Sequence, residues 1–196
     1  MEVFNLKIHY AGIFDEKPEN LPTNNKNHNS IIIINKINNY IVCPLLMITI
    51  SIPIALKYKY SLNIKMIEFI LGIILGLLSL YPHELLHALC YKKDVYVYLK
   101  KNGSAFVIGT EEMTKFKYIY TCLLPNIVLG IIPYVTFLIN PQISFLGIYS
   151  LICIGIGSKD YIDVYNIISQ VPNYSKIYLD KDKIYWYKIL TQKNIK

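Results

Sequence analysis

Long apolar blocks alternate with short lysine-bearing segments along this chain. Residues 37–56 carry no charged side chain over 20 positions, and residues 118–158 carry none over 41 positions. Because a helix needs about 20 apolar residues to cross a bilayer, the longer block predicts two spans joined at residues 140–142. A further apolar run, residues 69–80, predicts another span. We therefore expect about four membrane-spanning helices.

The expected spans cover about residues 40–56, 66–91, 118–139 and 143–171. Pro82 interrupts the hydrogen-bond ladder of the second span, so a kink is expected one residue before His83. The fourth helix is expected to continue beyond Gly157 and to stop near Pro172.

Two β-hairpins are expected outside the bilayer. Their strand pairs are residues 95–99 with 105–108 and residues 176–179 with 184–187. Asn102-Gly103 supplies the positive φ angles of a tight turn in the first hairpin. Residues 3–10 alternate loosely and predict a short strand, whereas residues 15–30 are rich in asparagine and proline and predict a loop.

Composition agrees with this fold class. Apolar residues make up 54% of the chain, and the mean hydropathy is +0.35. We expect a mainly α, polytopic membrane helix bundle of about four transmembrane helices with small β-hairpins on the cytoplasmic side. The expected organisation is an N-terminal segment (1–39), a core (40–171) with a hairpin insert at about 92–117, and a C-terminal hairpin and tail (172–196).

The net charge of +7 comes from lysine alone, because the chain has no arginine. The lysines flank apolar spans, which favours a membrane partner and no nucleic acid. In a four-span topology, 17 lysines fall on one side and three on the other. The excess of lysine on the cytoplasmic side of membrane proteins predicts an integral membrane protein with both termini in the cytoplasm.

The chemistry of the chain centres on His83-Glu84-Leu85-Leu86-His87. Helix positions four apart share a face, so both imidazoles can point at one ion. Two imidazoles suit Zn2+, and the glutamate between them can act as base for a zinc-bound water. Two surface histidines beside a solvated glutamate are the alternative, but apolar flanking sequence argues against solvation.

A third zinc ligand is expected from the fourth span, because a catalytic zinc keeps three protein ligands and one water. Lysine counting makes the second and fourth spans run in the same direction, so Asp160 reaches the membrane depth of His83 and His87. We expect Asp160 as ligand, with Asp163, one turn later, as its substitute or as a hydrogen-bond partner to a ligand histidine.

Other candidates for the third ligand stay open at this point: Cys90, Asp94, Glu111 and Glu112. A longer metzincin pattern is excluded, because Cys90 and Lys93 stand where it requires glycine and histidine. His9 and His28 have no partner at ligand spacing and are expected to be exposed. Asn126, an amide in the third span, is interpreted as a helix-packing contact.

From about residue 79 to residue 187, the chain resembles the bacterial zincin peptidases, small membrane proteins related to site-2 proteases. The shared features are the His83–His87 motif in a membrane helix, a strand pair after it, Leu124-Pro125-Asn126, and Ser158-Lys159-Asp160. The resemblance implies zinc bound by His83, His87 and Asp160, with Glu84 catalytic. Site-2 proteases carry Leu-Asp-Gly where this chain has Lys159-Asp160-Tyr161.

These observations predict a membrane-embedded zinc metallopeptidase that cleaves a membrane-associated protein. Its substrate segment must unwind before cleavage, because a membrane helix hides its peptide bonds. Pairing with an edge of the first hairpin would hold the unwound segment. The alternatives are a non-catalytic membrane protein, metal-binding or of immunity or sensor type, and a peptidase for soluble peptides at the cytoplasmic surface.

Overall fold

The computed structural model describes residues 8–14, 30–34, 39–61, 66–101, 103, 105–180 and 183–189. The predicted loop at residues 15–30 therefore lies almost wholly outside the described residues, as does His28. The predicted strand at residues 3–10 is described only from Ile8, where strand β1 begins.

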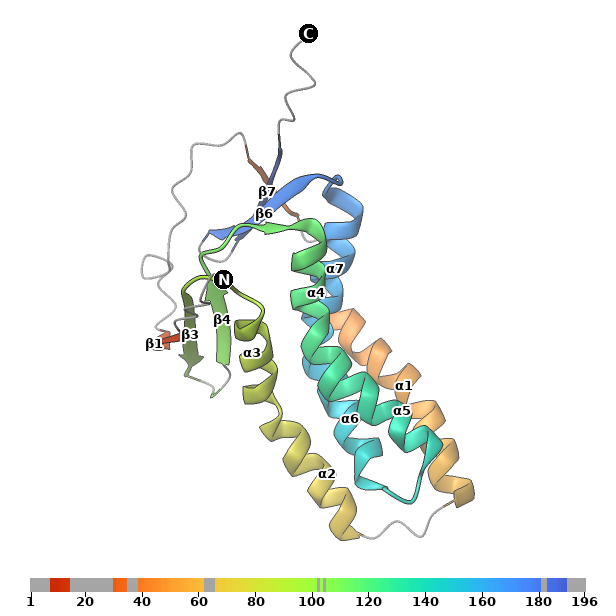
Figure 1. Cartoon of the computed structure of the whole chain (residues 1–196). Helices are drawn as coiled ribbons and strands as arrows, with labels where there is room; N and C mark the ends of the chain where they lie inside the picture. Colours follow the sequence, from red (N-terminus) through yellow and green to blue (C-terminus); the bar gives the residue numbers. More distant parts are fainter. Residues whose placement is uncertain are drawn as a thin grey trace, which may run out of the picture. The chain divides into compact units, whose positions relative to one another are not determined.

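Helices dominate the described chain, as the sequence predicts, and small sheets accompany them (Figure 1). The helices are α1 (Asn39–Ser61), α2 (Met66–Leu78), α3 (Leu80–Leu89), α4 (Lys115–Pro125), the π-helix η2 (Asn126–Ile131), α5 (Ile132–Ile139), α6 (Phe145–Ile156) and α7 (Ser158–Gln170). The strands are β1 (Ile8–Phe14), β2 (Ile31–Ile32), β3 (Val95–Lys100), β4 (Ala105–Gly109), β5 (Met113–Thr114), β6 (Ser175–Asp180) and β7 (Lys183–Lys188).

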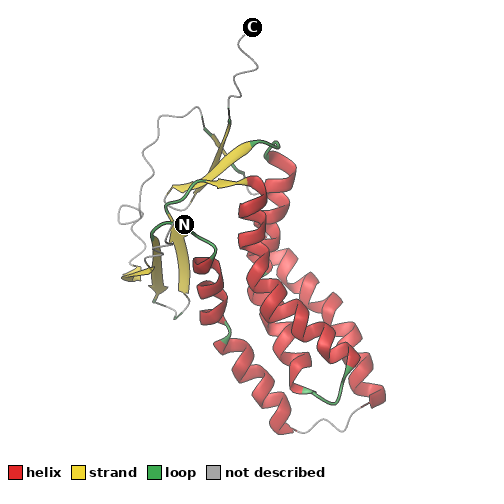
Figure 2. Ribbon diagram, viewed as in Figure 1, coloured by secondary structure: helices red, strands yellow, loops and turns green. Residues whose placement is uncertain are grey.

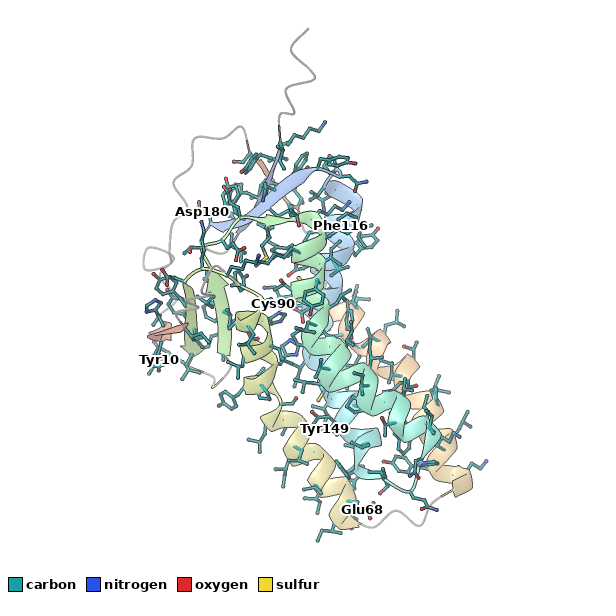
Figure 3. All side chains as sticks on the ribbon, in the orientation of Figure 1. Tyr10, Glu68, Cys90, Phe116, Tyr149 and Asp180 are labelled. Carbon is teal, nitrogen blue, oxygen red and sulfur yellow. The ribbon has the colours of Figure 1, made fainter. Side chains whose placement is uncertain are left out.

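The chain divides into two compact units. The mixed unit comprises Met1–Lys36, His87–Thr121 and Val164–Lys196, and the helical unit comprises Ile37–Leu86 and Cys122–Asp163. Every described strand, yellow in Figure 2, belongs to the mixed unit. Helices α3, α4 and α7 each begin in one unit and end in the other.

Helix α6 is the centre of the helical unit and packs against α1, α2, η2 and α5. Glycines let α2 approach it closely. A Cβ added at Gly72 would lie 2.7 Å from the Phe145 carbonyl oxygen, and one added at Gly76 would lie 2.9 Å from Ile152 Cβ. Small residues at such positions are typical of tightly packed helices in apolar surroundings.

Three described helical stretches are long and apolar enough to cross a membrane: Ile41–Lys59, Met66–Leu89 and Lys115–Ile139. A fourth candidate, α6 followed by α7, passes the same test only as a pair bent by 47°. The expected fourth helix therefore does continue beyond Gly157, but with a bend. The first helix also runs to Ser61, past the predicted end at residue 56.

The helix is interrupted one turn before Pro82, at Ser79, between α2 and α3. A proline ring clashes with the carbonyl four residues before it, which here belongs to Leu78. Pro82 itself sits in the first turn of α3, where an N–H would have no helical partner. Ser79 bridges the break, since its carbonyl accepts the His83 N–H at 2.9 Å and its hydroxyl donates to the Gly76 carbonyl at 2.6 Å.

The first hairpin of the mixed unit is confirmed, and it carries an additional strand. Strands β3 and β4 pair antiparallel as far as Leu99 and Ala105, and β1 adds to β3 in parallel. Between the two strands, Gly103 has the expected positive φ of 82°. Because β1 occupies the outer edge of β3, β4 is the other edge of this sheet.

The second hairpin is confirmed by β6 and β7, which pair antiparallel from Ser175 with Lys188 to Asp180 with Lys183. It forms the centre of a four-strand sheet with the order β2-β7-β6-β5. Its edge strands are β2, which lies between β1 and β3 in the chain, and β5, which follows β4.

Gly76→Leu is expected to destabilise the helical unit by about 1–3 kcal/mol, because the new side chain would overlap Ile152 of α6. The thermal unfolding midpoint in detergent measures the effect. Leu77→Phe is the control, since it adds bulk at a neighbouring position that is 61% exposed. Equal midpoints for the two variants would contradict close packing of α2 on α6.

Candidate metal centre

The centre of the site is a contact between His83 and Asp160, both in the helical unit. His83 is buried on α3, and its Nε2 lies 3.0 Å from Asp160 Oδ2. Asp160 stands in the first turn of α7. There the unpaired N–H groups of a helix favour a negative charge. Residues 77 positions apart in the sequence are thus in direct contact.

His87 follows His83 by one turn on α3. One ligand atom from each of His83, His87 and Asp160 lies within 4.8 Å of the other two. Zinc prefers imidazole nitrogen and carboxylate oxygen at about 2.0–2.2 Å, which separates the ligands of a tetrahedral site by about 3.3 Å. The donor set fits zinc in type and in number, and the 3.0 Å between His83 Nε2 and Asp160 Oδ2 is close to that separation.

The orientation of the His87 ring follows from a proline in α4. Pro125 has no N–H, so the carbonyl of Thr121, four residues earlier, lacks its usual helical donor. His87 Nδ1 lies 2.9 Å from that oxygen. A carbonyl only accepts, so Nδ1 carries the hydrogen, and Nε2 keeps the lone pair that a metal needs.

Asn126 contributes a contact that the sequence does not predict. Its side chain is completely buried, and its amide nitrogen lies 2.8 Å from Asp160 Oδ2 and 3.1 Å from the Cys122 carbonyl oxygen. The residue does join two helices, but its partner is the carboxylate itself. The available signal was an amide directly after a proline within a block of 41 uncharged positions.

The acidic residues that were alternatives to Asp160 as third ligand contact other groups, all within the mixed unit. Glu111 accepts hydrogen bonds from the Lys92 N–H at 2.6 Å and the Lys117 ammonium at 2.5 Å. Glu112 accepts one from the Tyr187 hydroxyl at 3.0 Å. Burial and then the nearby Glu112 carboxylate raise the pKa of Tyr187 to about 12.

Asp94 also has a partner, the exposed His9, whose exposure is as predicted. Asp94 Oδ1 lies 3.2 Å from His9 Nε2. The His9 ring also stacks on Tyr96, with 5.2 Å between ring centroids. Cys90 and Asp163 are half-buried and do not belong to the group of three ligand atoms.

Glu84 lies on α3 directly after His83 and is half-buried. Its place in the chain is the one that the motif requires of a base.

Comparison with protein families identifies the family of this chain. Residues 76–176, just over half of the chain, match the model of a family described as "Putative zincin peptidase". The chain belongs to this family. Searches of curated proteins and of solved structures found no match. The family region contains α3, Asn126 and Asp160, and membership implies zinc and a metallopeptidase activity.

In this zincin peptidase, Pro125→Ala is expected to weaken metal binding about tenfold, the lower end of effects seen when a partner of a ligand histidine is lost. The new N–H would compete with His87 Nδ1 for the Thr121 carbonyl. Competition with a chromogenic chelator measures the affinity. Pro53→Ala, within α1, is the control, and an unchanged affinity for Pro125→Ala would show that His87 does not depend on this carbonyl.

Proposed function

We propose that this protein is a membrane-embedded zinc metallopeptidase, similar in type to site-2 proteases, that hydrolyses peptide bonds of a membrane-associated protein. One observation carries the proposal. Two imidazoles from His-Glu-x-x-His and a carboxylate from a distant helix lie within 4.8 Å of one another. Three such donors are the set that a catalytic zinc uses, with its fourth position left for water.

Embedding in a membrane is supported by the apolar helices and by the distribution of lysine. Three described helices, and a fourth in bent form, meet the length and hydropathy of a span. Of the 20 lysines, 17 fall on one side of a four-span topology. In the proposed topology both termini face the cytoplasm, the hairpins lie on that side, and the site lies near the inner leaflet.

The residues divide the chemistry between them. His83, His87 and Asp160 would hold the zinc ion, which acidifies a water and polarises the scissile carbonyl when it is bound. Glu84 accepts the proton of the attacking water and returns it to the departing amine. The Thr121 carbonyl keeps His87 in the tautomer that can bind a metal.

The substrate is proposed to bind as an extended segment. A membrane helix must unwind before its peptide bonds can be attacked, and the released N–H and C=O groups then need partners. The strand order β1-β3-β4 makes β4 an edge strand. Pairing of the unwound segment with that edge would supply the lost hydrogen bonds.

The ligand set predicts that purified protein holds about one zinc per chain. His83→Ala and Asp160→Ala are expected to lose most of it, because two ligands do not retain zinc against a chelator. Elemental analysis after dialysis measures the content. Glu111→Gln is the matched control, and it should retain zinc because Glu111 binds Lys92 and Lys117. Loss of zinc from Asp163→Asn alone would instead make Asp163 the third ligand.

Glu84→Gln is expected to keep the zinc and to reduce cleavage about 10²–10⁴-fold, the usual contribution of a general base. A fluorogenic peptide library presented in detergent or liposomes gives the rate, and Glu112→Gln is the control. Undiminished cleavage by Glu84→Gln would remove Glu84 from the mechanism. Bound zinc without any cleavage by the unchanged protein would favour a metal-binding or sensor protein.

A further inference from the structure

The Asp160 carboxylate has a neighbour that neither the motif nor the family description assigns. Asn126 begins the π-helix η2, in the middle of the stretch from α4 to α5. A π-turn holds one residue more than an α-turn, so the side chains after it are shifted by about 100° around the helix axis. Such turns occur often at functional sites.

The amide of Asn126 is oriented by its surroundings. Its nitrogen faces two acceptors, Asp160 Oδ2 at 2.8 Å and the Cys122 carbonyl at 3.1 Å. The orientation with nitrogen toward these acceptors is therefore the one that makes hydrogen bonds. In the described part of the chain, Asn126 Oδ1 is buried and has no hydrogen-bond partner. Leaving a buried acceptor unsatisfied costs free energy. Asn126 therefore makes the two hydrogen bonds of its nitrogen while its own oxygen stays unpaired.

Space for this amide comes from Gly157, where α6 ends and the chain bends toward α7. A Cβ at position 157 would lie 1.5 Å from Asn126 Oδ1. Any other residue at 157 would push the amide away from the carboxylate. Asp160 follows by three residues, and its N–H donates to the Gly157 carbonyl at 3.0 Å. Gly157 thus makes room for the amide that binds the Asp160 carboxylate, and the bend at Gly157 begins the helix that carries Asp160.

We propose that Asn126 is a positioning residue, which holds the Asp160 carboxylate toward the metal through Oδ2. This inference rests on the proposed function, since it assigns a role toward the zinc that His83, His87 and Asp160 would bind. With Asn126 donating to Oδ2 and the N-terminus of α7 close by, the carboxylate is held in one orientation within apolar surroundings. Asn126 does not touch the reacting atoms.

The test compares metal binding by Asn126→Leu and by the unchanged protein. Leucine has the branching and the number of side-chain heavy atoms of asparagine but donates no hydrogen bond. Zinc and cobalt affinities are expected to fall about 10- to 100-fold. The visible absorption bands of bound cobalt are expected to shift, because one ligand changes its orientation. Thr136→Val is the matched control, since Thr136 lies on the same stretch and donates only to the Ile132 carbonyl, at 2.9 Å.

Gly157→Ala is the second variant, and it tests the inference if Asn126→Leu fails to fold. It leaves Asn126 in place and displaces the amide, so the same loss of affinity and the same spectral shift are expected. Wild-type affinity and spectrum in either folded variant would overturn the positioning role.

A double-mutant cycle in metal-free protein separates this inference from the proposed function. Asn126→Leu should lower the folding equilibrium constant about tenfold or more when Asp160 is present, and by much less in an Asp160→Ala background. Unchanged protein that binds no metal would end both the proposed function and the positioning role, even if the coupling between the two side chains were found. Metal binding without coupling would overturn only the role of Asn126.

Discussion

The Asp160 carboxylate, with 16% of its side chain exposed, lies 3.0 Å from the buried imidazole of His83. The rest of the helical unit supplies the contacts that stabilise this polar pair. An ionised group in apolar surroundings is costly unless it has partners. Asp160 has three sources of compensation: the ring of His83, the amide of Asn126 and the N-terminal turn of α7. Zinc would add a fourth, and the strongest, because a divalent ion is the largest charge at such a site.

His83, Asn126 and Asp160 each lie within a few residues of a proline or glycine near a helix interruption. Pro82 precedes His83, Pro125 precedes Asn126, and Gly157 comes three residues before Asp160. Interruptions of a helix in apolar surroundings leave backbone groups that need new partners. Here the side chains of the site take part in satisfying them, since His87 binds the Thr121 carbonyl and Asn126 binds the Cys122 carbonyl. The same breaks that weaken the helices therefore orient the residues that carry the chemistry.

The mixed unit holds the ends of the helices that carry the site. The Lys115 ammonium donates to the carbonyls of Ile168, at 3.4 Å, and Val171, at 2.6 Å, and so closes the C-terminal end of α7. Glu111 joins the chain after α3 to Lys117 in α4. Glu111, an alternative to Asp160 as ligand in the sequence, is thereby engaged in structural contacts. Lys115, Lys117 and Glu111 thus stabilise the mixed unit, whereas the proposed metal ligands all lie on helices α3 and α7.

Much of this protein follows from local sequence. Uncharged blocks of helix length determine the apolar helices, Gly103 and the alternation around it determine the first hairpin, and the spacing of His83 and His87 determines that both share a face of one helix. These features involve residues within a few turns of one another. Lysine distribution, which acts along the whole chain, added the expectation that Asp160 reaches the same depth as the histidines.

The contacts that complete the site were decided only by the tertiary structure. Nothing local relates Asn126 to Asp160, or shows that Thr121 offers its carbonyl to His87, because these partners lie 34 residues apart in each case. The π-turn at Asn126 and the bend at Gly157 arise from how the helices pack, and a helical period of 3.6 residues predicts neither. Sequence determines which residues can bind a metal, whereas packing decides how each one is turned toward it.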